Sequence, residues 1–222
     1  MAKTEPVVCE IFYSIQGESS FAGLPCLFFR LAGCNLRCSY CDSHYSYEEP
    51  GRAMPIAALV AEAERYPDVI IEITGGEPLM QAATVPLMTA LLARGRTLLL
   101  ETNGSLPIAA VPDGVHIVLD VKCPGSGNPV FCEDNLAEIA RRNRERAFVE
   151  LKFVLSSLED YQFAQDFLRT HPPPATTPIS LSPVADRLAL PELAEWMLRD
   201  AIAARLQPQL HRLIWPQVER GR

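Results

Sequence analysis

Three cysteines stand close together in the stretch AGCNLRCSYCDSH, residues 32–44. Cys34, Cys38 and Cys41 follow the spacing C-x3-C-x2-C, and the next cysteine along the chain is Cys123. Thiols at such short separations are typical of a metal centre, because one loop can bring all of them to the same metal. A structural metal site normally has four protein ligands. The stretch therefore raises the question of what supplies the fourth.

Two kinds of metal centre fit three cysteines. The first is zinc: with His44 as the fourth ligand, the stretch would form a Cys3His shell. The second is a 4Fe–4S cluster, whose iron atoms usually take four cysteine thiolates. With three thiolates one iron keeps an open coordination position, which suits catalysis, as an open position also distinguishes catalytic zinc from structural zinc. The cysteine spacing alone leaves both centres open.

Polar side chains interrupt several segments that otherwise read as buried strands. In CLFFRLA, Arg30 falls in phase with Phe28, and in VIIEIT, Glu72 falls in phase with Thr74. A buried guanidinium is costly without an anion, so Arg30 needs either a protein carboxylate such as Glu72 or an anionic ligand. Strands that each turn polar at their carboxyl end predict a ligand cavity at that edge of the sheet. Two further strands end in the same way: Glu101 with Asn103, and Asp120 with Lys122.

A pair of glycines follows one of these strands, in TGGEP at residues 74–78. Glycine has no Cβ atom, so the backbone at this turn can approach a ligand or another segment closely. The motif begins about thirty residues after the cysteines. The three features together predict one site built at the carboxyl ends of the strands.

The elements that must position these residues alternate between strand and helix. Such alternation implies right-handed βαβ units and a mostly parallel sheet. We expect an α/β fold: a partial, TIM-like β/α barrel of about six parallel strands with a reduced set of helices, forming a single domain over residues 1–222. The predicted strands are 8–13, 26–31, 69–74, 97–102, 115–121, 149–154 and 179–182, and the predicted helices are 55–66, 80–94, 133–146, 157–170 and 190–206.

Composition narrows the class of protein. The 222 residues are 48% apolar and carry a formal net charge of −7, which supports a large core and argues against nucleic acid as a partner. No apolar run approaches the length of a membrane span, and the first ten residues resemble neither a signal peptide nor an anchor, so we expect no membrane association. Seven cysteines, three of them clustered, do not resemble a disulfide framework and favour a cytoplasmic location.

The order of these motifs resembles the radical S-adenosylmethionine superfamily. C-x3-C-x2-C in a β/α protein, followed by a strand that ends in GGEP, is its pattern. The resemblance implies a 4Fe–4S cluster on three cysteines, with S-adenosylmethionine bound to the open iron. It further implies that an electron from the cluster cleaves this co-substrate to an adenosyl radical, which takes a hydrogen atom from the substrate.

A narrower resemblance covers residues 8–216. The segments EIFYSIQGESSFAGLPCLFFRLAGCNLRCSYCDS, TGGEP, ETNGSLP, LDVKCPGSG, ELKFV and QLHRLIWP are similar to the 7-carboxy-7-deazaguanine synthase family. This resemblance implies a lyase that converts 6-carboxy-5,6,7,8-tetrahydropterin to 7-carboxy-7-deazaguanine with release of ammonia, for queuosine and deazapurine biosynthesis, assisted by Mg2+. An activase of a glycyl-radical enzyme, or a zinc-stapled binding module for RNA or protein, are the alternative functions.

The family resemblance also assigns roles to residues. Arg30 would pair with the substrate carboxylate, and Ser43 would hold Mg2+ by its hydroxyl. The cluster loop would span about 32–47, with Cys34, Cys38 and Cys41 as the iron ligands. Besides Arg30, the implied substrate contacts are Ile15, Gln16, Gly17, Glu18, Thr74, His211 and Pro216. The implied S-adenosylmethionine contacts are Tyr40, Cys41, Asp42, Gly76, Glu101, Asn103, Asp120, Val121, Lys122, Ser182, Pro183 and Val184.

The C-terminal segment, about residues 207–222, is expected to close over the substrate. Its last residues, QVERGR, extend beyond Pro216, where other family members end, so a role for a terminal carboxylate is in doubt. The resemblance implies a flavodoxin or ferredoxin as electron donor, and a homodimer, the commonest symmetric assembly, is expected.

Overall fold

A computed structural model describes residues 5–144, 149–218 and 220–221. Its centre is a nine-stranded sheet in the order β3-β1-β2-β4-β5-β6-β7-β8-β9. All pairs from β2 to β9 are parallel, while β1 runs antiparallel to both β2 and β3. The strands are β1 (Val7–Ile15), β2 (Pro25–Leu31), β3 (Arg52–Ala53), β4 (Ile70–Gly75), β5 (Leu98–Thr102), β6 (Val115–Asp120), β7 (Val149–Leu155), β8 (Ile179–Pro183) and β9 (Arg205–Leu206).

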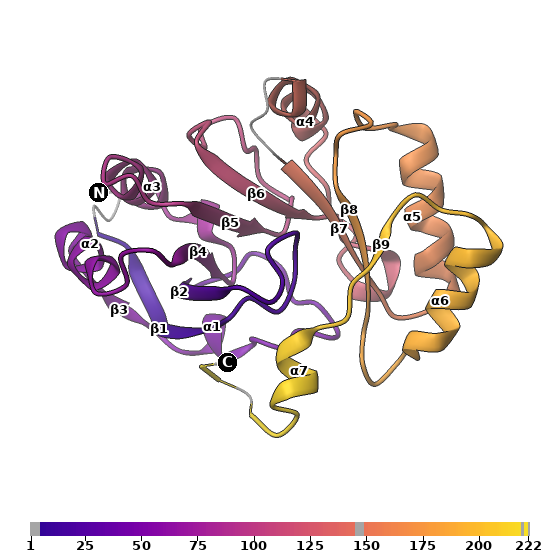
Figure 1. The fold of residues 1–222 in the computed structure, drawn as a ribbon, viewed down its shortest axis with the longest axis horizontal. Coiled ribbons are helices and arrows are strands. Elements are labelled where there is room, and N and C mark those ends of the chain that lie inside the picture. The colour runs from indigo at the N-terminus through magenta and orange to yellow at the C-terminus, as the bar shows by residue number, and fades with distance from the viewer. Residues whose placement is uncertain (1–4, 145–148, 219, 222) are drawn as a thin grey trace.

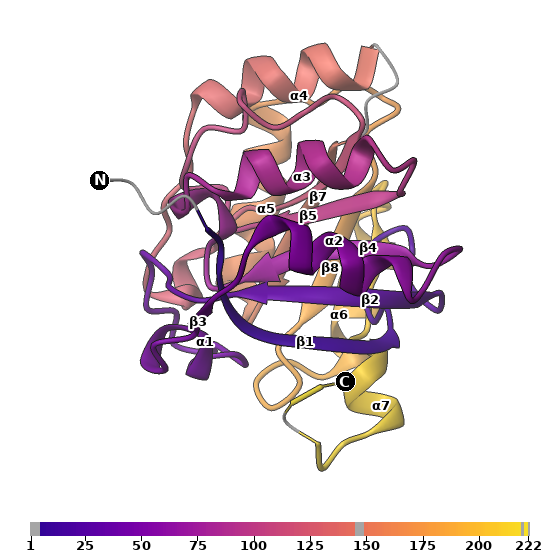
Figure 2. The same cartoon turned by 90° about the vertical axis from the view of Figure 1, so that its left-hand side faces the viewer.

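The sheet curves, and the long helices line its outer side (Figure 1). Figure 2 shows α2 and α3 stacked beside strands β1, β2 and β4. The α-helices are α1 (Tyr45–Glu48), α2 (Ile56–Glu64), α3 (Thr84–Leu92), α4 (Asp134–Arg144), α5 (Leu158–Thr170), α6 (Leu190–Arg199) and α7 (Leu210–Ile214), with short 3-10 helices η1 (Pro78–Met80) and η2 (Pro124–Ser126). The predicted partial barrel is therefore confirmed: six full-length parallel strands, followed by the two-residue strand β9.

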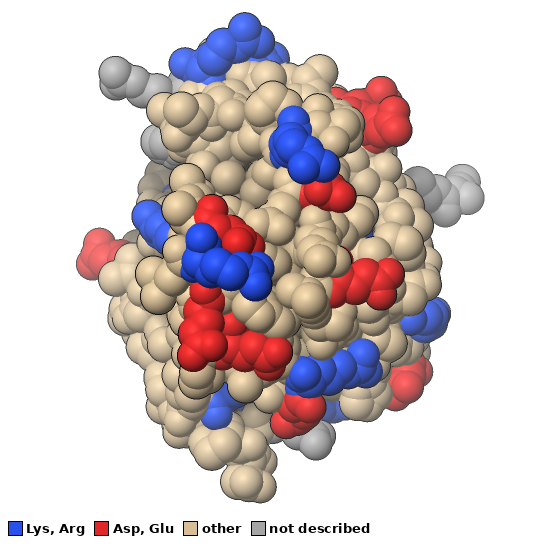
Figure 3. Space-filling model, turned by 90° about the vertical axis from the view of Figure 1, so that its right-hand side faces the viewer, with Lys and Arg blue, Asp and Glu red and all other residues tan. Residues whose placement is uncertain are grey.

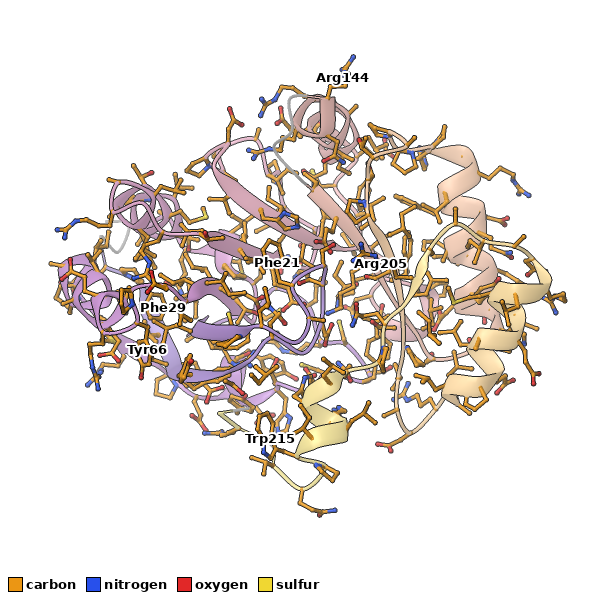
Figure 4. All side chains as sticks on the ribbon, viewed as in Figure 1. Phe21, Phe29, Tyr66, Arg144, Arg205 and Trp215 are labelled. Atoms are coloured by element: carbon orange, nitrogen blue, oxygen red, sulfur yellow. The ribbon has the colours of Figure 1, made fainter. Side chains whose placement is uncertain are left out.

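Alternation along each strand separates the core from the site. On β4, Ile71 and Ile73 belong to the hydrophobic core, whereas Glu72 and Thr74 face a cavity on the other side of the sheet. Phe29 of β2 lies in the same core (Figure 4). Because the helices cover only one face, the apolar positions of each strand pack against them and the polar positions are left to the cavity.

One predicted helix is wrong in its second half. Residues 190–206 were expected to be continuous, but α6 ends at Arg199 and Ala201 adopts a left-handed conformation with φ of 48°. Residues 205–206 instead join the sheet as β9, beside Ser180 and Leu181 of β8. The apolar periodicity continued past the end of the helix, but pairing with β8 satisfies the backbone groups of Arg205 and Leu206 in a way that sequence spacing does not reveal.

The other predicted helices are found with shorter bounds. The helix expected at 55–66 begins after Pro55, which is its N-cap residue, and the helix expected at 80–94 is split between η1 and α3. The last two residues of the helix expected at 133–146 lie outside the described residues. In the part of the chain that the structure describes, no helix has the length and apolar character of a membrane span.

The surface over α5 and α6 carries charges of both signs (Figure 3). Several of them form exposed pairs within these helices or at their ends, such as Arg169 with Asp166 at 2.8 Å and Arg199 with Asp200 at 2.7 Å. Charges of opposite sign are therefore interspersed on this face.

Candidate active site

A cavity of about 630 Å³ lies on the side of the sheet opposite the long helices. It gathers side chains from β1, β2, β4, β5, β6 and β7, from the cysteine loop and from the C-terminal segment. The predicted site residues that line it are Ile15, Gln16, Gly17, Glu18, Arg30, Cys34, Cys38, Tyr40, Cys41, Asp42, Ser43, Thr74, Gly76, Glu101, Asn103, Asp120, Lys122, Val184, His211 and Pro216.

Three predicted contacts do not line the cavity. Val121 is fully buried in the hydrophobic core, because it is in phase with Ile117 and Leu119 on the helix side of β6. Ser182 and Pro183 are buried at the end of β8 and are also absent from the cavity wall. For these three positions the structure places no side chain at the site.

Hydrogen bonds from Ser39 hold the cysteine loop against the short helix η2. The amide of Ser39 donates to the carbonyl of Ser126 at 2.9 Å, and its hydroxyl donates to the carbonyl of Gly125 at 2.7 Å. Arg187 donates to the carbonyl and the hydroxyl of Ser39, at 2.7 and 2.9 Å. Gly125 is in turn held by the buried carboxylate of Asp160, at 2.7 Å. The loop thus holds its cysteines toward the cavity without a disulfide, since all seven cysteines are free.

The environment of the cysteines bears on their protonation. Burial raises the pKa of the Cys38 thiol, and the ammonium of Lys122 opposes this rise. Burial also raises the pKa of the Cys41 thiol, and hydrogen bonds from Ser43 oppose it. Only thiolates bind metals, so a cluster must displace the protons of these thiols, and Lys122 and Ser43 lower the cost of doing so.

The TGGEP turn packs directly against the cysteine loop. A Cβ atom on Gly76 would lie 2.1 Å from the carbonyl oxygen of Gly33 and 2.7 Å from Cβ of Cys34, so only glycine fits there. The amide of Glu77 donates to the same Gly33 carbonyl at 2.8 Å. The buried carboxylate of Glu77 accepts hydrogen bonds from the Asn103 amide, at 2.7 Å, and from the Thr102 hydroxyl. The turn therefore joins the cysteines to the end of β5.

The donor set fits an iron–sulfur cluster better than a closed zinc shell. No group of three or more His, Cys, Asp or Glu side chains among residues 5–144, 149–218 and 220–221 is gathered tightly around one ion position. His44, the fourth ligand of the zinc alternative, lies beside Glu48, with 3.8 Å between Nε2 and Oε2. Cys34, Cys38, Cys41 and His44 line one wide cavity, and their spread leaves room for a cluster and for a ligand on its open iron.

Arg30 is positioned by a carboxylate on the neighbouring strand. Its Nε donates to Oε1 of Glu10 at 2.8 Å, and the two residues are direct cross-strand partners on β1 and β2. The hydroxyl of Tyr45 donates to the same Glu10 oxygen at 2.8 Å. The guanidinium carbon lies 5.5 Å from the ring centroid of Phe12 and 5.8 Å from that of Tyr45. The suggested internal pair of Arg30 with Glu72 is wrong: the protein partner is Glu10.

Lys152 of β7 joins two carboxylates across the cavity. Its ammonium contacts Oε2 of Glu18 and lies 2.6 Å from Oε1 of Glu101, whose other oxygen accepts the Thr74 hydroxyl at 3.0 Å. Burial alone would raise the pKa of Glu101, but the charge and hydrogen bond of Lys152, with the hydrogen bond from Thr74 and the charge of Arg30, together outweigh burial and lower that pKa to about 2. Burial would lower the pKa of Lys152, and Glu101 and Glu18 together raise it. Lys152 and Glu101 therefore stay charged at neutral pH.

Gln16 and Glu72 form a second buried pair. The Gln16 amide donates to Oε2 of Glu72, and its carbonyl oxygen accepts the Glu18 backbone amide at 3.0 Å. Both ends of the Gln16 side chain are thereby engaged, and its backbone amide and carbonyl are paired with Leu24 and Gly23, each at 2.8 Å. Burial, reinforced by the charge of Glu101, raises the pKa of Glu72 well above its ordinary value.

Asp120 is the last residue of β6, and Lys122 lies two positions after it. Nζ of Lys122 lies 2.6 Å from Oδ2 of Asp120. Oδ1 of Asp120 is buried, and within the described part of the chain it accepts no hydrogen bond. A buried acceptor without a partner is costly, so this oxygen at the cavity wall is suited to a donor group on a ligand.

Residues of the C-terminal segment line one side of the cavity. The amide of Leu210 donates to the carbonyl of Gly17 at 3.1 Å, and Gln209 donates to Oε1 of Glu18 at 2.7 Å. A Cβ atom on Gly17 would lie 2.5 Å from Nδ1 of His211, so this glycine allows the histidine ring to approach. The two segments that carry the predicted substrate contacts thus meet at the cavity.

Several residues of the site were not predicted. Lys152 lies in phase with Glu150 and Val154, and the rule that singled out Asp120 and Lys122 would have found it. Glu10 could not be found this way, because its importance depends on its register with Arg30 across β1 and β2. The other lining residues that the sequence did not single out include Phe12, Tyr45, Tyr47, Asp186, Arg187, Gln209, Arg212 and Trp215.

Comparison with known proteins gives one consistent result. The Radical SAM superfamily matches residues 30–121. The 7-carboxy-7-deazaguanine synthase of Chlorobaculum tepidum is 45% identical, with 96% of each chain covered. The protein of that name from Koribacter versatilis is 39% identical, covering 96% of this chain and 99% of its own.

Solved structures agree on the fold. The crystal structure of QueE from Escherichia coli matches with a TM-score of 0.73 at 23% identity, covering 92% of this chain and 94% of that one. The crystal structure of SuiB from Streptococcus suis bound to S-adenosylmethionine matches with a TM-score of 0.59 at 15% identity. The match covers 83% of this chain and 50% of that one. The relatives together show that this chain belongs to the 7-carboxy-7-deazaguanine synthase family of the radical S-adenosylmethionine superfamily, whose members carry a 4Fe–4S cluster and bind S-adenosylmethionine.

Proposed function

We propose that this protein converts 6-carboxy-5,6,7,8-tetrahydropterin to 7-carboxy-7-deazaguanine, with release of ammonia, as a step of queuosine or deazapurine biosynthesis. The observation that carries the proposal is the presence in one cavity of three cysteines and of Arg30, a cation placed to receive a carboxylate. Relatives that are 45% and 39% identical over nearly the whole chain are named for the formation of this product.

Cys34, Cys38 and Cys41 would hold the cluster, which with bound S-adenosylmethionine supplies an adenosyl radical. Around it, Gly76 offers backbone groups at close range, and the unpaired Oδ1 of Asp120 offers an acceptor to a donor group. The remaining proposed contacts of S-adenosylmethionine on the cavity wall are Tyr40, Asp42, Glu101, Asn103, Lys122 and Val184.

Arg30 would bind the carboxylate of the substrate. Glu10 occupies Nε, and among the described residues the two terminal amino groups make no hydrogen bond, so they are available for a planar, bidentate partner. Glu10 and the rings of Phe12 and Tyr45 hold the guanidinium in place. This arrangement favours a carboxylate over a neutral group at the same position.

The pterin ring would lie against Ile15, Gln16 and Gly17 and be covered by His211 and Pro216. The Gln16 side chain is engaged by Glu72 and Glu18, and its backbone by Leu24 and Gly23. Its contact with the ring would use the second lone pair of its backbone carbonyl or the second N–H of its side-chain amide. Glu18 is proposed to read the amino-pyrimidine edge, and Thr74 to touch the ring from β4. Gln16, Gly17 and Thr74 are buried, which would help to keep water from the reacting atoms.

Further parts of the proposal concern the surroundings of the reaction. Mg2+ would be held by the hydroxyl of Ser43 and by substrate oxygens, as a hard cation prefers oxygen ligands. A flavodoxin or ferredoxin would supply the electron. We also propose that the protein works as a homodimer in the cytoplasm.

The test is an anaerobic incubation of the reconstituted protein with reductant, S-adenosylmethionine, Mg2+ and 6-carboxy-5,6,7,8-tetrahydropterin. We expect 7-carboxy-7-deazaguanine and ammonia in equal amounts, and none from a Cys38→Ala variant, which cannot hold the cluster. Cleavage of S-adenosylmethionine without any deazapurine would contradict the proposed substrate and favour an activase. A colourless protein that contains zinc would contradict the radical chemistry as well.

A further inference from the structure

Some residues after Pro216 contact the cavity or the helix α1. Gln217 and Val218 line the cavity, and the amide of Val218 donates to the carbonyl of Trp215 at 3.1 Å. Figure 4 shows Trp215 just beyond α7, at the edge of the molecule. We name residues 215–218 the C-terminal strap. Arg220 follows it and lies against α1.

Arg220 makes two kinds of contact with α1 and its C-cap. Both terminal nitrogens engage the carboxylate of Glu49: Nη1 at 3.3 Å from Oε2, and Nη2 in contact with Oε1. The guanidinium carbon also lies 3.9 Å from the ring centroid of Tyr45. A bidentate ion pair combined with stacking on an aromatic face fixes the orientation of an arginine more firmly than either contact alone.

Tyr45 connects this contact with the substrate arginine. Only 6% of Tyr45 is exposed, and its hydroxyl donates to the Glu10 oxygen that also accepts from Arg30. Arg30 lies over the same ring, 5.8 Å from its centroid. An unbroken series of contacts therefore runs from Arg220 through Tyr45 and Glu10 to Arg30.

We propose that Arg220 is a positioning residue for substrate binding. It holds the C-terminal strap over the mouth of the cavity and, by fixing Tyr45, keeps Glu10 and Arg30 in the orientation that receives a carboxylate. Arg220 does not touch the substrate and acts only through these residues. The inference rests on the proposed function, since the carboxylate that Arg30 receives is that of the proposed pterin.

The expected change in KM on removal of the Arg220 guanidinium depends on how exposed the ion pair with Glu49 is. The side chains of Arg220 and Glu49 are 48% and 47% exposed, so solvent screens their attraction and the ion pair alone contributes little. With the stacking on Tyr45 added, we expect removal of the guanidinium to raise KM about three- to tenfold. The value of kcat should change less than about twofold, because no group at the reacting atoms is altered.

The test compares Arg220→Gln with a matched control, Arg65→Gln. Arg65 makes the same kind of contacts away from the cavity: its Nη1 lies 2.8 and 2.9 Å from the carboxylate oxygens of Glu62, and its guanidinium carbon lies 5.9 Å from the ring centroid of Tyr66. We expect a higher KM for the pterin only in Arg220→Gln, with iron content and thermal stability equal in both variants.

A second measurement follows the strap without turnover. The chain has two tryptophans, so a Trp196→Phe background leaves Trp215 of the strap as the only one. In that background, Arg220→Gln should increase quenching of Trp215 fluorescence by acrylamide, because the strap is released, whereas Arg65→Gln should leave it unchanged.

The outcomes separate this proposal from the proposed function. Equal KM values and equal quenching in the two variants would overturn the role of Arg220. Increased quenching with an unchanged KM would show that the strap is released without consequence for Arg30, and would also overturn it. Absence of deazapurine from the unaltered protein would be a failure of the proposed function instead, and quenching would still report on the strap.

Discussion

Arg30 is the residue on which recognition of the substrate depends in this account. Its charge is balanced by Glu10, and its terminal amino groups are directed to a cavity that also holds the three cysteines. An arginine held in this way binds a planar carboxylate more selectively than a lysine could, because the guanidinium presents two parallel donors.

Replacing Arg30 with alanine should weaken substrate binding while the cluster is retained. We expect a loss of about 2–5 kcal/mol in binding free energy, the usual range when one partner of a buried charge pair is removed. Equilibrium binding of the pterin to the anaerobic protein would measure it, with iron content as the control. An unchanged dissociation constant would remove Arg30 from the substrate site.

Lys152 should contribute to stability in a way that depends on pH. Its charge lowers the pKa of Glu101 to about 2, so the ion pair stabilises the folded state above the ordinary pKa of a glutamate and is lost as the pH falls toward 2. In Lys152→Met the carboxylates of Glu18 and Glu101, whose side chains are 14% and 30% exposed, lose their partner. We expect this variant to be less stable by about 3–5 kcal/mol at pH 7.

The difference between Lys152→Met and the unaltered protein should shrink at pH 4, because the unpaired carboxylates can then be protonated. Urea unfolding of the cluster-free protein at the two pH values would measure it. A difference that is the same at pH 7 and pH 4 would show that lost packing, and not lost charge, causes the effect.

At the scale of elements, the site depends on turns that join the ends of strands. The TGGEP turn after β4 carries the cysteine loop on one side and the end of β5 on the other, through Gly76 and Glu77. From the sequence we expected the backbone at these two glycines to approach a ligand or another segment closely. It did not reveal that the neighbour is the cysteine loop itself, because that contact joins residues more than forty positions apart.

Gly76→Ala should therefore disturb the cluster. The added Cβ atom would meet the Gly33 carbonyl at 2.1 Å, so the cysteine loop must move. We expect less iron per protein after reconstitution. Gly114→Ala is the control, since its Cβ atom would meet only the end of the Leu92 side chain, at 3.1 Å, and that side chain can shift. Equal iron content in both variants would contradict the role of this turn.

At the scale of the whole molecule, strand alternation made both the fold and most of the site predictable. Period-two patterns on β2, β4, β5 and β6 placed apolar residues toward the helices and polar ones toward the cavity. Contacts between distant segments could not be predicted. The pairing of Glu10 with Arg30 depends on strand register, and strand β9 forms only because the chain after α6 returns to β8.

The same limit applies to the C-terminal strap. The family resemblance indicated that this segment closes over the substrate, but the residues beyond Pro216 had no assigned role. Among them, Arg220 contacts Glu49 at the end of α1, which lies more than 170 residues earlier in the chain. Charge and spacing within a segment do not identify so distant a partner.

Electron paramagnetic resonance of the reduced, reconstituted protein tests the central claim most directly. That claim is that three cysteines hold a 4Fe–4S cluster whose fourth iron is open to S-adenosylmethionine. The account predicts a cluster signal that changes when S-adenosylmethionine is added, and that is lost in Cys38→Ala. A signal that stays the same at saturating S-adenosylmethionine, or a protein that binds zinc in place of iron, would contradict it.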